Sequence, residues 1–246
     1  ALFLDLFLFE IHQSLYKKSK PNFSTIFLNA GAHIQHHYFL NASVLKNTKF
    51  ANPNWYIREN DDPVFDMLNC YDKIISQLLL SDNCELIIAT GLSQKPYDAV
   101  KFYYRLDNHE KFLKLLNINF ETVMPRMTRD FLIEFKSNEL AKDAQKILAS
   151  LKVNEEDPLF KEIDNRGKDL FVTLTYPNEI TQDSKIHVGN KAIHLLENVS
   201  FVAIKNGMHS EKGFAYFSSK IKKYAPKEKE HVSNIHTTIS KYFNIA

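Results

Sequence analysis

Three histidines lie close together in the stretch LNAGAHIQHHYF, at positions 33, 36 and 37. On a helix, residues three or four positions apart share a face, so His33 would lie beside both His36 and His37. This spacing is used by paired imidazole ligands of a divalent metal such as zinc, which binds nitrogen at about 2.0–2.1 Å. The alternative use of these side chains is hydrogen bonding to backbone groups and water, with no metal.

His209, in the segment KNGMHSEKG, is the candidate further ligand. It follows the predicted strand VSFVAI, and the three clustered histidines follow the predicted strand FSTIFLNA. In a doubly wound sheet, ligand-binding residues gather at the carboxyl ends of the strands. We therefore predict a site for a divalent metal, with zinc as the candidate ion, formed by His33, His36, His37 and His209.

The elements around these histidines alternate between helices and strands. The apolar spacing of residues 2–18 predicts an interior helix, and Asp62-Pro63 predicts the start of a second helix. CELIIAT then reads as a short buried strand. This order favours an α/β fold with a mostly parallel sheet flanked by helices.

The middle of the chain has a different pattern. The segments RDFLIEF, NELAKDAQKILASL, LFKEIDNRG and KDLFVTLTY predict the order strand, helix, strand, strand. An order of this kind is typical of a small α+β subdomain inserted into a larger sheet. We predict an α/β core made of residues 1–100 and 198–246, with an inserted α+β subdomain at residues 101–197.

The composition excludes several classes of protein. The 246 residues carry a net charge of +2, so no strong positive field points to nucleic acid or to an anionic membrane. A nucleic-acid role for residues 126–176 is not expected, because DFLIEF lacks the spaced aromatic residues that stack on bases. The apolar start is too short to span a membrane, and two cysteines form no disulfide framework, which favours the cytoplasm.

Five segments, taken in order, are similar to those of a known family. They are IFLNAGAHIQHHYF, NCYDKIISQLLL, CELIIATGLS, NGMHSEKGF with Gly207, His209 and Gly213, and VSNIHTTISKYFNI. The chain resembles the C-terminal half of the alkaline phosphatase superfamily, especially its nucleotide pyrophosphatase/phosphodiesterase and sulfatase-like branches. The resemblance implies an alkaline phosphatase-like half sheet for residues 1–100 and 198–246.

The resemblance also implies chemistry. Enzymes of that family hydrolyse phosphate or sulfate esters with two metal ions held by Asp and His, and a Thr or Ser nucleophile lies on the opposite half of the sheet. The resemblance implies that the nucleophile lies in that other half, outside these 246 residues, and the catalytic residues stay unassigned. Ala32 stands where the family has an Asp ligand, and Thr90-Gly91 stand where it has an Asp-His pair.

Two functions follow from these matches and departures. The first is a hydrolase that acts on a small-molecule, glycan or nucleotide ester through a remodelled metal site. The second is a catalytically degenerate family member that binds a ligand or a partner. Thr90, Arg126 and Arg129 are candidate substrate-binding residues, since arginine pairs with phosphate or sulfate. Surface ion pairs are the alternative use of the two arginines.

Overall fold

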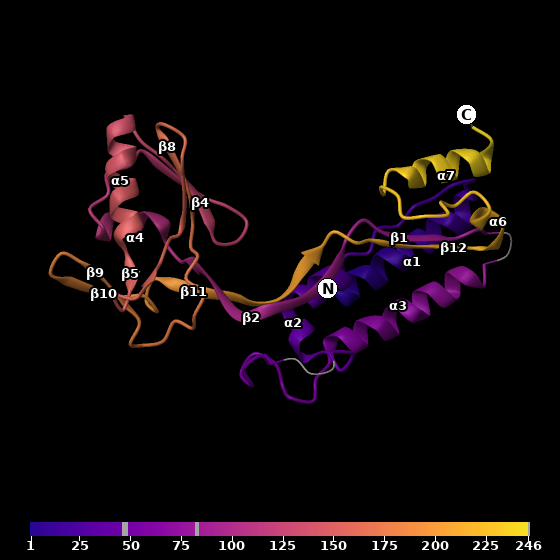
Figure 1. The fold of residues 1–246 in the computed structure, drawn as a ribbon, viewed down its shortest axis with the longest axis horizontal. Helices are drawn as coiled ribbons and strands as arrows, with labels where there is room; N and C mark the ends of the chain where they lie inside the picture. The colour runs from indigo at the N-terminus through magenta and orange to yellow at the C-terminus, as the bar shows by residue number, and fades with distance from the viewer. Residues whose placement is uncertain (46–48, 82–83, 246) are drawn as a thin grey trace. The chain divides into compact units, whose positions relative to one another are not determined.

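The computed structural model describes residues 1–45, 49–81 and 84–245. It divides the chain into two compact units, one made of Ala1–Asp98 and Asn206–Ala246 and the other of Ala99–Lys205 (Figure 1). We call them unit 1 and unit 2. Two long strands, β2 (Ser93–Leu106) and β11 (Val199–Ser210), pair with each other, and each contributes residues to both units.

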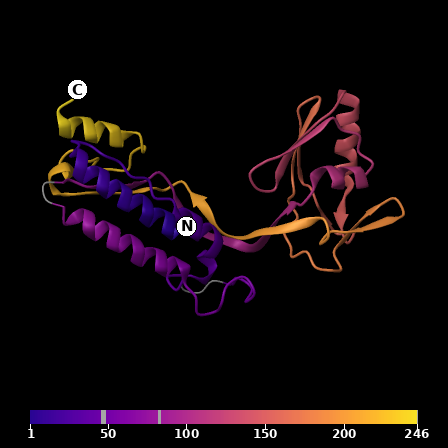
Figure 2. The same ribbon diagram turned by 180° about the vertical axis from the view of Figure 1, so that it is seen from behind.

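Unit 1 is mainly helical. Its elements are α1 (Leu2–Ser19), α2 (Ala30–Tyr38), the 3-10 helix η1 (Phe39–Asn41), α3 (Pro63–Leu79), β1 (Ile87–Thr90), β12 (Phe214–Phe217), α6 (Ser219–Lys222) and α7 (Asn234–Phe243). Helices α1 and α3 lie side by side (Figures 1 and 2), and α2 packs against both. Ile34 of α2 and Met67 of α3 are buried in their shared apolar core.

The prediction that residues 2–18 form an interior helix is wrong on one point. The helix forms, but only Asp5 and Phe9 are buried. The opposite face exposes Phe3, Leu4, Phe7, Leu8, Ile11 and Leu15. Apolar residues occur on all sides of this helix, a pattern that predicts burial on all sides. Within the described chain, only the side that carries Asp5 and Phe9 is buried. None of the helices in the described ranges is long and apolar enough to cross a membrane, as predicted.

The predicted mostly parallel sheet is also wrong. The segment FSTIFLNA, residues 23–30, is predicted to be a strand, but residues 23–29 join no sheet and Ala30 is the first residue of α2. Strand β1 pairs antiparallel with β12, with Ile87 opposite Phe217 and Thr90 opposite Phe214. The described sheets have two to four strands, and every register described is antiparallel. The FAYF segment, Phe214–Phe217, forms the strand β12 that pairs with β1.

Unit 2 is built on a four-stranded antiparallel sheet. The order of its strands is β3 (Thr122–Pro125), β4 (Asp130–Glu134), β8 (Asp169–Thr173) and β7 (Glu162–Asn165). Helix α5 (Asn138–Ser150) packs on β7 and β8, and the Ser137 side chain caps its first turn. The remaining elements are α4 (His109–Leu115) and the strand pairs β5 (Lys152–Val153) with β6 (Asp157–Pro158) and β9 (Lys185–Val188) with β10 (Lys191–His194).

The burial of the side chains alternates along β4, which shows that one face of this sheet is buried. Phe131 and Ile133 are fully buried, and the residues between and beside them are half-buried. Since successive side chains of a strand point to opposite faces, one face of the sheet turns toward α5 and the core. Leu148 of α5 is also fully buried, so the helix closes the core of unit 2.

Candidate functional site

The predicted histidines gather within unit 1, where α2 meets the end of β11. The Nε2 atoms of His36 and His209 lie 3.1 Å apart, and their ring centroids are 4.9 Å apart. His33 and His37, one helical turn apart on α2, have ring centroids 4.5 Å apart. The structure therefore brings the four residues together as two imidazole pairs.

The orientation of the His36 ring is fixed by a backbone contact. Its Nδ1 lies 3.1 Å from the carbonyl oxygen of Gly207. A carbonyl oxygen can only accept a hydrogen bond, so Nδ1 must carry the proton. In the neutral ring, Nε2 then holds a lone pair that points toward His209. A metal-binding histidine is held in the same way, with one ring nitrogen donating to a carbonyl and the other free to coordinate.

His37 is held in its neutral form. Partial burial, followed by the charges of the neighbouring His33 and His36, lowers its pKa to about 4. The hydroxyl of Tyr56 lies 3.5 Å from its Nδ1. At neutral pH the ring is therefore uncharged, and one of its nitrogens has a lone pair that can bind a cation.

Gly207 lets the end of β11 approach α2 closely. A Cβ at this position would lie 2.6 Å from the backbone oxygen of Gln35 and would also overlap the Gln94 side chain. The Gln94 amide donates to the Ala32 carbonyl at 2.9 Å, which ties β2 to the exposed side of the same helix. A glycine is required here because two backbones and a glutamine side chain meet.

A buried pair of amides fixes the residue before Gly207. Asn206 is fully buried, and its side chain exchanges hydrogen bonds with Asn52 at 2.7 and 2.8 Å. The Oδ1 atom of Asn206 also accepts from the backbone N–H of Leu40 at 2.9 Å. Buried amides that satisfy each other in this way hold one geometry, since breaking one contact leaves polar atoms unpaired. This pair holds β11 against the end of α2.

The start of α2 is held by Asp5. Its carboxylate accepts hydrogen bonds from the backbone N–H groups of Asn29 and Ala30 at 3.2 and 2.8 Å. It also accepts from the Tyr71 hydroxyl at 2.6 Å, and that hydroxyl accepts from the Gly31 N–H at 2.8 Å. Burial, followed by the hydrogen bond to Asp5, raises the pKa of Tyr71. A negative charge at a helix N-terminus is favourable, so Asp5 stabilises the helix that carries the histidines.

The chemistry of the histidine cluster fits part of a metal site. Two ligands of a tetrahedral zinc ion at about 2.0–2.1 Å are about 3.3 Å apart. The His36–His209 separation of 3.1 Å is close to this value. Over the described ranges, no group of three or more His, Cys, Asp or Glu side chains has the arrangement of a metal site. The residues therefore fit two protein ligands of one ion.

Among the described contacts, none joins the three predicted substrate-binding residues to the histidines. The Oγ1 atom of Thr90 accepts from the Phe214 N–H at 3.0 Å, which supports the β1–β12 pair. Arg126 and Arg129 belong to unit 2, whereas the histidines belong to unit 1. The Arg129 guanidinium lies 4.0 Å from the centre of the Tyr103 ring and donates to the Leu174 carbonyl at 3.1 Å. These contacts give Thr90 and Arg129 structural roles in their own units.

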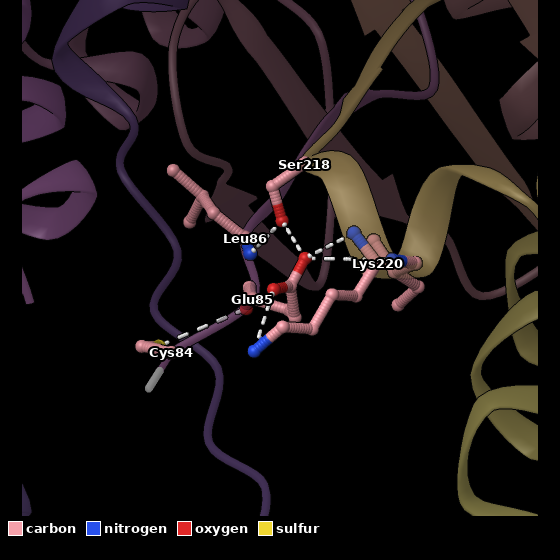
Figure 3. Close-up of polar contacts among 6 residues, drawn as sticks. Cys84, Glu85, Leu86, Ser218 and Lys220 are labelled. Atoms are coloured by element: carbon pink, nitrogen blue, oxygen red, sulfur yellow. Dashed lines mark hydrogen bonds and ion pairs between the residues drawn. The ribbon is translucent and has the colours of Figure 1, made fainter. Parts of the chain in front are cut away.

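Glu85 lies just before β1 and forms hydrogen bonds with residues just after β12, as Figure 3 shows. The Glu85 carboxylate accepts from the Ser218 hydroxyl at 2.6 Å and from the Lys220 N–H at 2.9 Å. The same hydroxyl accepts from the Leu86 N–H at 2.8 Å. The hydrogen bond from Ser218 lowers the pKa of Glu85, so the carboxylate stays charged at the start of α6.

The chain was compared with known protein families, with curated proteins and with solved structures, and none of the three comparisons gave a match. The resemblance to the alkaline phosphatase superfamily therefore stays a prediction from the motifs. Sequence reasoning missed Asp5, Asn52 and Asn206. The single acid within the apolar run LFLDLFLF is the signal that points to Asp5.

Proposed function

We propose that the protein is a metal-dependent hydrolase of phosphate or sulfate esters, and that His36 and His209 bind the metal. The observation that carries this proposal is the contact between their Nε2 atoms at 3.1 Å, with His36 Nδ1 directed at the Gly207 carbonyl. Two imidazoles without a metal would also share a proton at this distance. The tautomer of His36, with its lone pair directed at His209, is the form that a cation between the two rings requires.

Each residue has a defined part in this proposal. His36 and His209 supply nitrogen ligands, and Gly207 keeps the His36 lone pair in place. A divalent ion bound there supplies Lewis-acid chemistry by polarising an ester oxygen. His37 is neutral at pH 7 because its pKa is lowered to about 4, so it adds no positive charge beside the metal ligands. The proposal assigns no nucleophile.

The motif matches support the same choice of reaction. The loop with Gly207, His209 and Gly213 is similar to the Gly-x-His-x-x-x-Gly loop of the alkaline phosphatase superfamily. That loop contributes a metal ligand in the family, and here it contributes the imidazole that faces His36. The carboxylate ligand expected at position 32 is Ala32, so the proposed site is smaller than the family's two-metal site.

The second candidate function is binding without chemistry. It is favoured by Ala32 and Thr90-Gly91 in place of charged ligands, and by the described residues offering fewer than three ligands at one point. In such a protein the imidazole pair would hold an anion or a partner's side chain. The two functions differ in turnover, which makes them separable by one assay.

The assay uses a panel of phosphate and sulfate monoesters and diesters, with zinc, manganese or iron added to the metal-depleted protein. We expect metal-stimulated turnover that is lost in His209→Ala and retained in His187→Ala. His187 is a matched control because it is an exposed histidine of unit 2. Metal binding without turnover on any ester would support the binding protein, and absence of metal binding would refute the hydrolase.

A further inference from the structure

The segment FSTIF, residues 23–27 of unit 1, has the sequence of a strand but no partner strand. Its aromatic and β-branched residues favour extended structure, and residues 23–29 contain no helix, turn or bend. Over the described ranges, no backbone N–H or C=O group of residues 23–28 takes part in a hydrogen bond. An unpaired strand carries donors and acceptors along its edges, so this segment can accept another strand.

Two contacts with α1 hold the segment in place. The Nε2 atom of His12 lies 3.2 Å from the Ser24 hydroxyl, and the Asn29 N–H donates to the Asp5 carboxylate at 3.2 Å. Since Ser24 lies beside the later residue of the helix and Asn29 beside the earlier one, the segment runs antiparallel to α1. A segment fixed in this way loses less conformational entropy when a partner strand binds.

Three side chains of the segment are exposed on the same side. Phe23, Thr25 and Phe27 are exposed, whereas Ile26 between them is half-buried. Alternate residues of an extended chain point to opposite sides, so the three exposed side chains share one side. Phe23 is 54% exposed, with its ring 6.3 Å from that of Phe243, and Phe27 is 78% exposed. The exposed side therefore consists of two aromatic rings with a threonine between them.

We propose that this segment pairs antiparallel with the same segment of a second copy of the chain, and that the two copies form a symmetric dimer. Phe23 and Phe27 are equally far from Thr25 in the sequence. Antiparallel pairing about Thr25 thus places Phe23 of each copy opposite Phe27 of the other, and the two Thr25 side chains face each other. Aromatic pairs and Thr–Thr pairs stabilise neighbouring strands, and twofold symmetry is the commonest symmetry of oligomers. A second copy is favoured over other partners because the segment complements itself at all three exposed positions.

A charge at position 25 tests the pairing. Like charges directly opposite each other destabilise a strand pair, so Thr25→Lys and Thr25→Asp should each raise the dissociation constant of the dimer at least about 100-fold. Sedimentation equilibrium of the whole protein at micromolar concentrations should give twice the 28.6 kDa of one chain for the wild type, and the mass of one chain for either variant. Thr128→Lys, at an exposed threonine of unit 2, is the control and should remain dimeric.

Mixing the two charge variants separates a lost interface from a damaged fold. In an equimolar mixture the introduced ammonium of one copy faces the introduced carboxylate of the other, so dimers that contain one chain of each variant should reappear. Thr25 is exposed and makes no hydrogen bond within the described ranges, so both variants should keep the wild-type circular dichroism spectrum. A mixture that stays monomeric overturns the proposed pairing about Thr25.

Hydrogen exchange locates the interface without any substitution. The amides of residues 23–27 should exchange more slowly at high than at low protein concentration, because the dimer supplies the backbone hydrogen bonds that these residues lack in the single chain. A monomeric wild type overturns the inference. A dimer that forms without slowing these amides overturns it as well, because it assigns the contact to another surface, such as the exposed face of α1. None of these measurements requires metal, so the dimer and the proposed hydrolase are tested separately.

Discussion

His36 and His209 meet through their Nε2 atoms at 3.1 Å, although 173 positions separate them in the chain. The contact depends on two features beside His209 on β11. Gly207 removes the side chain that would separate β11 from α2, and Asn206 holds the strand by its buried amide pair with Asn52. The geometry of the proposed metal site is therefore set by residues that do not themselves bind metal.

Gly207→Ala tests the close approach of β11 to α2. The new Cβ would lie 2.6 Å from the Gln35 carbonyl oxygen, so the strand must move away. We expect the free energy of unfolding to fall by about 1–3 kcal/mol and zinc affinity to fall with it. Urea denaturation and calorimetric zinc titration measure both. Gly91→Ala is the control, because its Cβ would meet only Val232, at an ordinary 3.9 Å; equal losses in the two variants would contradict this role.

Asp5→Asn tests the support of α2. The amide nitrogen would face N–H and O–H donors at Asn29, Ala30 and Tyr71, which now donate to the carboxylate. We expect a loss of about 2–3 kcal/mol in the free energy of unfolding, since hydrogen bonds to a buried charge are among the stronger ones. Glu10→Gln, an exposed acid on the same helix, should cost little. The explanation fails if chemical denaturation gives the same stability for both variants.

Phe9 and Phe7 lie on opposite faces of α1 and test which face is packed. Phe9 is 1% exposed and Phe7 is 56% exposed. Phe9→Ala should reduce the free energy of unfolding by about 3–5 kcal/mol, because it leaves a cavity. Phe7→Ala should change it by about 0.5 kcal/mol or less. Thermal unfolding of the two variants decides, and a comparable loss in Phe7→Ala would show that the outer face is covered in solution.

The lowered pKa of His37 makes stability depend on pH. Its folded pKa is about 4 against an ordinary 6.5, so the unfolded chain binds its proton first as the pH falls. The stability that comes with the neutral ring is complete above about pH 6.5 and is lost as the pH falls to about 4. Because the ring is partly exposed, we expect a loss on the order of 1–2 kcal/mol.

His37→Gln should remove that part of the pH dependence. The free energy of unfolding from urea titrations at pH 7 and pH 4.5 is compared with the wild type and with His194→Gln, an exposed histidine of unit 2. The expected result is a smaller difference between the two pH values in His37→Gln than in the other two proteins. Identical differences in all three would refute the assignment.

Local sequence signals predicted several elements correctly. Asp62-Pro63 predicts the start of a helix, and in α3 the Asp62 side chain accepts from the Phe65 N–H at 2.9 Å. The apolar spacing of NELAKDAQKILASL predicts α5, which begins after the Ser137 cap. Both signals act within one turn of the chain, so no knowledge of distant residues is needed.

The pairing of the strands could not be predicted from such local signals. Nothing local in CELIIAT states whether its partner is parallel or antiparallel, and the partner FAYF is more than 100 residues away. The strand-end argument placed His209 near the α2 histidines, but β11 continues through His209 to Ser210 and does not end before it. The roles of Asp5 and Asn206 depend on partners that are distant in the chain, so they could not be predicted from local sequence patterns either.

Calorimetric titration of the metal-depleted protein with zinc tests the central claim most directly. The account predicts saturable binding of one zinc ion per chain, abolished in both His36→Ala and His209→Ala and unchanged in His187→Ala. Retained folding of the two variants is checked by circular dichroism, because His209 is exposed and its removal should leave the fold intact. Zinc binding that survives in either His36→Ala or His209→Ala, or its absence in the wild type, would contradict the account.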